Sequence, residues 1–138
     1  MGKINFTRVI LGGLLAGLVV NIFEYVTNGV VLASQWGDGM KALGHEMPQG
    51  AIPIFIVTSF VMGIGVVWLY AAARPRLGPG AKTAVLTGVA FWFFAYALPN
   101  SSYAVMQLFS TRLITITTLV ALVELIAASL CGAWLYRE

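Results

Sequence analysis

The sequence predicts an all-α integral membrane protein whose four transmembrane helices form one bundle. Hydrophobic residues make up 59% of the 138 residues and charged residues only 9%, and the mean hydropathy is +0.89. A soluble domain needs far more polar surface than this composition supplies. The charged residues also lie mainly between long apolar runs, which is the distribution that a hydrocarbon core imposes on a chain.

Four apolar runs are long enough to cross a bilayer as helices. At about 1.5 Å per residue, a helix of about 20 residues crosses a hydrocarbon core of about 30 Å. The predicted helices cover residues 9–32, 52–73, 84–109 and 113–136. The third run contains Pro99-Asn100-Ser101-Ser102, so we expect this helix to kink or to end early near Pro99. The whole chain, residues 1–138, is predicted to be a single transmembrane domain.

The Lys and Arg residues predict which way the chain crosses the membrane. Six of the eight fall on the side of both chain termini and two on the other side: Lys3, Arg8, Arg74, Arg76, Lys82 and Arg137 against Lys41 and Arg112. Basic flanking residues favour the cytoplasm. We therefore expect a multi-pass protein of a cell membrane, of the bacterial inner membrane type, with both termini cytoplasmic. This bias explains the net charge of +3, so no nucleic-acid partner is expected.

A faint internal repeat suggests two repeated helical hairpins. Residues 57–70 can be laid on residues 123–136, and both segments end in Trp-Leu-Tyr. A duplicated hairpin gives two halves that are related by an axis along the membrane normal. Alternatively, two helices that run in the same direction have each placed aromatic residues at the same membrane interface. The sequence leaves both explanations open.

One face of the first helix combines glycines with polar side chains. The residues are spaced four, four, three and four apart, which places them in one row: Gly13, Gly17, Asn21, Glu24 and Asn28. The glycine pair is a GxxxG motif, which lets another helix approach closely. An acidic group at the centre of a lipid-facing helix costs roughly 2.5–3.5 kcal/mol. This face is therefore expected to look into the protein or into a wet cavity.

The last helix carries a matching surface. One of its faces holds Thr117, Ala121, Glu124 and Ala128, and Ala121 and Ala128 are small enough for close helix packing. Glu24 and Glu124 differ in depth by about 6 Å, so their carboxyl groups can meet. No Lys, Arg or His lies at that depth in the sequence. Tyr25 and Tyr96 are candidate hydrogen-bond donors to either carboxyl group.

These polar residues support two interpretations. In the first, Glu24 and Glu124, together with Asn21 and Asn28, form a proton or cation site within the membrane. In the second, neutral carboxylic acids and amides hold the helices together by hydrogen bonds that contribute about 1 kcal/mol each. The missing cationic partner favours the second interpretation.

The outward loop contains apolar residues at helical spacing: Trp36, Met40, Leu43 and Met47. This spacing predicts a segment on the membrane surface with its apolar side facing the lipid. The glycines of the loop disfavour a regular helix, so a loosely folded cap is the alternative. On the cytoplasmic side, residues 74–80 are predicted to form a stiff turn.

The sequence contains no enzyme signature. It has no nucleophile elbow, no phosphate-binding loop and no paired His or Asp set. One histidine and one cysteine give no basis for a metal or cofactor site. We therefore expect neither enzymatic activity nor a cofactor.

Two functions remain at this stage. The first is an accessory or structural subunit that packs by its glycine faces into a homo-oligomer or a larger complex within the lipid bilayer. The second is a small proton- or cation-linked transporter or channel that uses Glu24 and Glu124. A chain of 138 residues has little room for an enclosed substrate path of its own. This argument favours the subunit.

Overall fold

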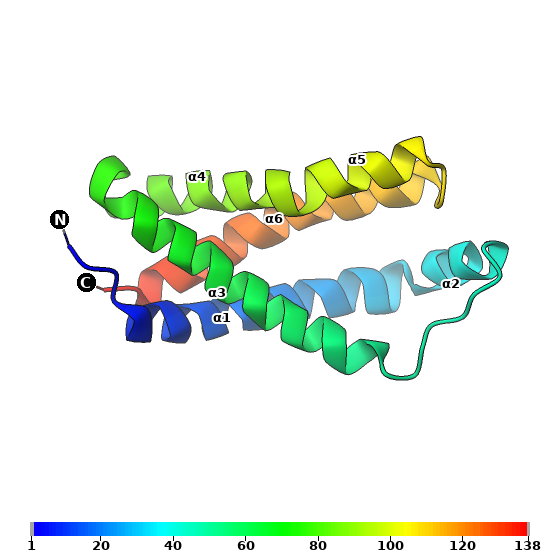
Figure 1. Ribbon diagram of the computed structural model, residues 1–138, viewed down its shortest axis with the longest axis horizontal. Coiled ribbons are helices and arrows are strands. Elements are labelled where there is room, and N and C mark those ends of the chain that lie inside the picture. Colours follow the sequence, from blue (N-terminus) through cyan, green and yellow to red (C-terminus); the bar gives the residue numbers. More distant parts are fainter. Residues whose placement is uncertain (1, 138) are drawn as a thin grey trace.

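The computed structural model describes residues 2–137, which form helices and connecting turns with no β-strand. Four helical stretches in this part of the chain are long and apolar enough to cross a membrane: Phe6–Val31, Ala51–Leu77, Ala81–Val105 and Thr111–Leu135. The predicted all-helical protein with four spans is thereby confirmed. Both chain termini lie at the same end of the molecule (Figure 1).

Two of the four spans are not uniform α-helices. The first consists of α1 (Phe6–Glu24) and the π-helical segment η1 (Tyr25–Val31), and the third of α4 (Ala81–Trp92), the π-helical segment η2 (Phe93–Ala97) and α5 (Leu98–Val105). The second and fourth spans are α3 (Ala51–Leu77) and α6 (Thr111–Leu135). π-Helical turns widen a helix locally and are frequent at functional sites.

The third span continues through Pro99 instead of ending there. It reaches Val105, short of the predicted end at residue 109. Proline lacks an N–H group, and its ring clashes with the carbonyl four residues earlier in a regular α-helix. The wider turn just before it relaxes this constraint: the N–H of Leu98 donates to the carbonyl of Phe93, five residues back.

The turn between the second and third spans is shorter than predicted. Helix α3 continues past Pro75 to Leu77, so most of the segment 74–80 is helical. The chain then reverses at Gly78 and Gly80, whose φ angles are 85° and 120°. Glycine adopts this left-handed region without the steric cost that a side chain imposes.

The outward loop contains a short helix, α2 (Ala33–Ala42). Residues 33–42 are therefore helical, although Leu43 and Met47 lie beyond the helix; that its apolar side faces the lipid stays a prediction. The ring of Trp36 meets that of Phe109 edge-on, with 5.0 Å between ring centroids. A Cβ atom added at Gly39 would lie 2.7 Å from the Phe109 ring, so glycine allows this close contact. Helix α2 thus contacts the turn before α6.

Helices α1 and α3 cross at their glycines. A side chain at Gly63 would meet the backbone of Gly13 and Gly17, and a Cβ at Gly17 would lie 2.7 Å from the Cα of Phe60. Only glycine permits two helix backbones to approach this closely in a membrane. The glycine row of the first helix therefore packs on α3, whereas the sequence predicted the last helix as its partner. The neighbouring Gly12 instead lies against Gly132 of α6.

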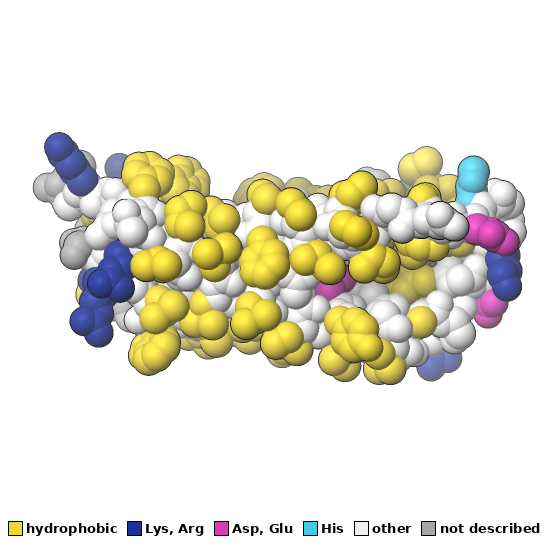
Figure 2. Space-filling model, turned by 90° about the horizontal axis from the view of Figure 1, so that it is seen from below, with side chains coloured by type: hydrophobic (Ala, Val, Ile, Leu, Met, Phe, Trp, Pro, Cys, Tyr) yellow, Lys and Arg dark blue, Asp and Glu magenta, His cyan; other side chains and the backbone are white. Residues whose placement is uncertain are grey.

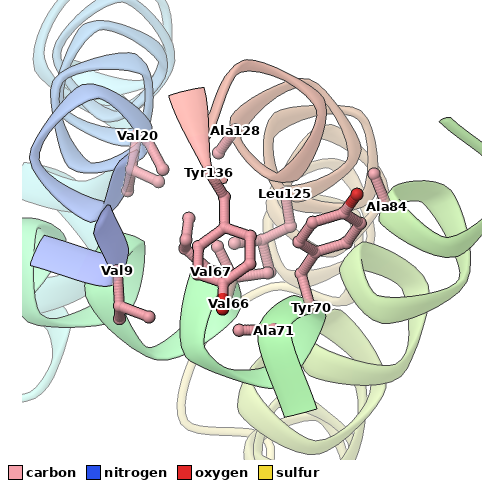
Figure 3. Close-up of a cluster of buried hydrophobic side chains, with 11 residues drawn as sticks. Val9, Val20, Val66, Val67, Tyr70, Ala71, Ala84, Leu125, Ala128 and Tyr136 are labelled. Carbon is pink, nitrogen blue, oxygen red and sulfur yellow. The ribbon is translucent and has the colours of Figure 1, made fainter. Parts of the chain in front are cut away.

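The closely packed core lies in the half of the bundle near the chain termini, which we call the basic end. Figure 3 shows side chains from all four spans meeting there, including Val20, Val66 and Leu125. The rings of Tyr70 and Tyr136 meet edge-on, with centroids 6.0 Å apart, and the guanidinium of Arg74 lies 5.5 Å from the Tyr136 ring centroid. These aromatic contacts close the basic end.

The opposite half, which we call the α2 end, is packed much more loosely. The first span has no buried residue after Val20, the second has none before Ser59, and the third has none after Gly88. Figure 2 shows a hollow in this half, with an acidic side chain at its margin among apolar ones. The bundle is thus more tightly packed at the basic end, whereas at the α2 end the buried residues include Leu32, Leu113 and Ile114.

Candidate functional site

The carboxyl groups of two glutamates meet at the hydroxyl group of Tyr96. Its oxygen lies 3.0 Å from Oε1 of Glu24 and 3.3 Å from Oε1 of Glu124. Glu24 ends α1, Tyr96 belongs to η2, and Glu124 belongs to α6. Tyr96 therefore reaches across the bundle and connects three of its four spans at one point.

A second pair of hydrogen bonds connects this cluster to the α2 end. The amide of Asn28 donates to Oε2 of Glu24 over 2.6 Å, and the indole N–H of Trp36 donates to Oδ1 of Asn28 over 2.9 Å. A continuous row of polar contacts thus runs from Trp36 on α2 to Glu124 inside the bundle. We call Glu24, Asn28, Tyr96 and Glu124 the carboxyl cluster.

The two glutamates differ in access to solvent. Glu124 is 1% exposed, whereas Glu24 is half-buried and lies at the start of the loosely packed half. The electrostatic neighbours of Glu124 are Glu24 and Tyr96, and no cation of the described chain is among them. Two carboxyl groups therefore share a site in which every identified neighbour is an acid, an amide or a phenol.

Local helix geometry positions the cluster. Asn28 lies within η1 and Tyr96 within η2, and Glu24 directly precedes η1. A π-helical turn contains about one more residue than an α-helical turn, so it rotates the residues that follow it relative to those before it. These two widened turns set the directions of the polar side chains. No residue pattern in the sequence indicated them.

The other predicted site residues lie elsewhere. The amide of Asn21 donates to the carbonyl of Gly17 in its own helix and, over 3.4 Å, to that of Ile56 in α3. Asn21 therefore connects two helices and does not contact either carboxyl group. Ala121 and Ala128 are buried on α6, as are Gly13 and Gly17 on α1.

Sequence reasoning only partly identified the partners of the carboxyl groups. Of its two candidate tyrosines, Tyr96 contacts both glutamates, whereas Tyr25 is 69% exposed and makes no such contact. The sequence predicted that Trp36 lies on the apolar side of a segment on the membrane surface, and its hydrogen bond to Asn28 was missed. The eight-residue separation in a loop gave no signal for that bond, because it depends on how α2 folds back.

Within residues 2–137 no group of three or more His, Cys, Asp or Glu side chains is placed to hold a metal ion. Comparisons of the chain with protein-family models, with curated proteins and with solved structures find no match.

Proposed function

We propose that this protein is a small proton-linked transporter or channel in which Glu24 and Glu124 bind the proton. The observation that supports this most strongly is the placement of one tyrosine hydroxyl between the two carboxyl groups, at 3.0 and 3.3 Å. Intramembrane acids that face the protein interior commonly form proton relays. Their meeting in this structure reverses the preference for the subunit that the sequence alone supported.

The hydrogen count of the cluster supports a shared proton. Tyr96 has one hydroxyl hydrogen, so it can donate fully to only one glutamate at a time. Its second short contact becomes a hydrogen bond when the other carboxyl group carries a proton and donates to the tyrosine oxygen. Two interacting carboxyl groups then bind and release protons as one coupled unit.

The different accessibility of the glutamates suggests the order of transfer. Glu24 is half-buried beside the open half of the bundle, so water can exchange a proton with it. Glu124 is buried behind Tyr96: the tyrosine oxygen takes up the proton of Glu24 while the tyrosine releases its own hydroxyl hydrogen to Glu124. The indole of Trp36 and the amide of Asn28 only position Glu24, because neither group readily passes a proton on.

Proton flux into vesicles tests this proposal. Purified protein in liposomes with an enclosed pH-sensitive dye and an imposed proton gradient should acidify the lumen faster than empty liposomes. Glu24→Gln and Glu124→Gln should each abolish this flux, because an amide has nearly the shape of a carboxylic acid but does not titrate. Glu46→Gln, in the exposed loop, is the matched control and should retain flux. Equal flux in all variants and the wild type would rule out the carboxyl cluster as the proton site.

An accessory or structural subunit is the second candidate, and the loosely packed half of the bundle favours it. Towards that end, three of the four spans have no buried residue over their last turns, beyond Val20, Ser59 and Gly88, which leaves a surface for another chain. Purification of the tagged native protein in a mild detergent, followed by mass spectrometry, should then recover constant partner proteins. A homo-oligomer alone would be compatible with the transporter, and the flux assay would then decide. The two Gln variants should keep the assembly if the glutamates act only as hydrogen-bonding groups.

We also propose that the basic end faces the cytoplasm of a bacterial cell, in its inner membrane. Six basic residues flank this end in the sequence, and such residues favour the cytoplasmic side. Single cysteines introduced at Lys82 and Lys41 in a Cys131→Ser background test the orientation. A membrane-impermeant maleimide should label intact cells only at position 41. Labelling at position 82 alone would indicate the reverse orientation.

Finally, we propose that the hairpins α1–α3 and α4–α6 are diverged repeats. The hydroxyl of Tyr70, at the basic end of α3, accepts a hydrogen bond from the N–H of Gly80 just before α4. The hydroxyl of Tyr136, after α6, accepts one from the N–H of Asn5 just before α1. Each hairpin thus contacts the start of the other through the same residue of its Trp-Leu-Tyr ending. If the hairpins are repeats, one hairpin can replace the other as its partner. Either hairpin expressed alone should therefore form a dimer that a chemical cross-linker captures. A hairpin that remains monomeric would count against a repeat.

A further inference from the structure

A groove of about 300 Å³ lies between the third span and α6, towards the α2 end. Its polar lining consists of Asn100 and Ser101 from α5 and Thr115 and Thr118 from α6, beside the indole of Trp92. No charged residue lines it. Asn100 and Ser101 belong to the polar segment that interrupts an otherwise apolar run, and they have no part in the carboxyl cluster.

The hydroxyl hydrogens of this groove are already used within the helices. Ser101 donates to the carbonyl of Leu98, Thr115 to that of Thr111, and Thr118 to that of Ile114, over 2.6–2.7 Å. Their oxygen lone pairs therefore remain available as acceptors. These three oxygens can therefore bind only a ligand group that donates a hydrogen bond.

Asn100 supplies both kinds of hydrogen-bonding group. One of its two amide hydrogens is donated to Oγ1 of Thr118 over 2.8 Å, which fixes the side chain. Its second hydrogen and its Oδ1 atom make no hydrogen bond within residues 2–137. A single ligand hydroxyl satisfies both, because it donates one hydrogen and accepts another.

We propose that this groove binds the hydroxyl end of a lipid alcohol, such as a long-chain fatty or isoprenoid alcohol, from the surrounding bilayer. The absence of charged residues from its lining disfavours a phosphate or ammonium headgroup, which would lose its hydration without gaining a counter-ion. The volume of the groove is near the lower end of the range for ligand pockets, which is enough for the hydroxyl group and the first carbon atoms of the lipid chain. The apolar lining residues Ala97, Ala104 and Leu119 contact that chain. This site is independent of the carboxyl cluster.

Photolabelling in lipid nanodiscs tests the proposal. The full-length protein is irradiated with a hexadecanol that carries a diazirine near its hydroxyl group, and the labelled peptides are identified by mass spectrometry. Labels should concentrate on residues 97–104 and 114–119, and excess hexadecanol should compete for them whereas excess hexadecane should not. Equal competition by hexadecane would overturn the proposal, because the groove would then be an ordinary part of the lipid-facing surface.

Variants of the polar lining provide the second readout. Ser101→Ala and Asn100→Leu should each lower the competable labelling by about 3- to 10-fold, as expected for the loss of one hydrogen bond. Ser102→Ala is the matched control, because Ser102 follows Ser101 on the same helix but does not line the groove, and its labelling should stay unchanged. Should Asn100→Leu fail to fold, Ser101→Ala still decides the question: unchanged labelling of that folded variant would contradict the proposal.

Discussion

The hydroxyl oxygen of Tyr96 lies 3.3 Å from Oε1 of Glu124, a side chain that is 1% exposed. This contact joins the third span to the fourth inside the bundle, and the same hydroxyl also contacts Glu24 of the first span. A buried polar group that loses its partner costs more free energy than the average hydrogen bond contributes. The stability of the bundle should therefore depend on this one oxygen atom.

Tyr96→Phe should lower the free energy of unfolding by about 1–3 kcal/mol, because it leaves buried carboxyl oxygens without their donor. Denaturant unfolding in detergent measures the change. Tyr25→Phe is the matched control, since that tyrosine is 69% exposed and makes no contact with the cluster; its effect should stay within about 0.5 kcal/mol. Equal stability of the two variants would show that Tyr96 does not hold the cluster together.

Gly63→Ala should destabilise the bundle by about 1–3 kcal/mol, because the added methyl group meets the backbone of Gly13 and Gly17 and forces α1 and α3 apart. The midpoint of thermal unfolding in detergent provides the measurement. Gly37→Ala is the control, since a Cβ atom there meets nothing within 4 Å. The control should leave the midpoint unchanged or raise it slightly through better helix propensity. A drop of the same size in both variants would contradict the role assigned to the crossing.

Trp36→Phe and Trp36→Ala separate the two contacts of α2. The phenylalanine variant loses the hydrogen bond to Asn28 but keeps an aromatic ring beside Phe109, whereas the alanine variant loses both contacts. Amide hydrogen exchange of residues 33–42 should therefore accelerate moderately in the first variant and strongly in the second. Unchanged exchange in Trp36→Ala would mean that these contacts do not hold α2 against the bundle.

The tyrosines at the basic end should be energetically coupled. Tyr70→Phe and Tyr136→Phe each remove one hydrogen bond to a backbone N–H and should cost about 0.5–1.5 kcal/mol. Both keep the edge-on ring contact, which Tyr70→Ala and Tyr136→Ala remove. A double-mutant cycle on the alanine variants should give a coupling energy of about 0.5–1.5 kcal/mol, and additive effects would exclude a direct interaction of the rings.

The sequence by itself determined the class of the protein, its four spans and the polar face of the first helix. The lengths of the apolar runs and the positions of the charged residues are enough to locate the spans. A helix needs about 20 apolar residues to cross a bilayer, and charged side chains are disfavoured within the hydrocarbon core. Helical spacing alone likewise placed Asn28 and Glu24 on one face. These features depend on residues close together along the chain.

The tertiary structure decided which faces meet. It paired the glycines of α1 with α3, selected Tyr96 over Tyr25 as the partner of the glutamates, and folded α2 so that Trp36 reaches Asn28. The first two contacts depend on the rotation and crossing of helices that are distant in sequence, and the third depends on how α2 folds back. Tyr96 and Asn28 lie within π-helical segments, whose wider turns change the direction of side chains. A residue pattern fixes the periodicity of a helix, whereas its rotation about its own axis is set by packing against its neighbours.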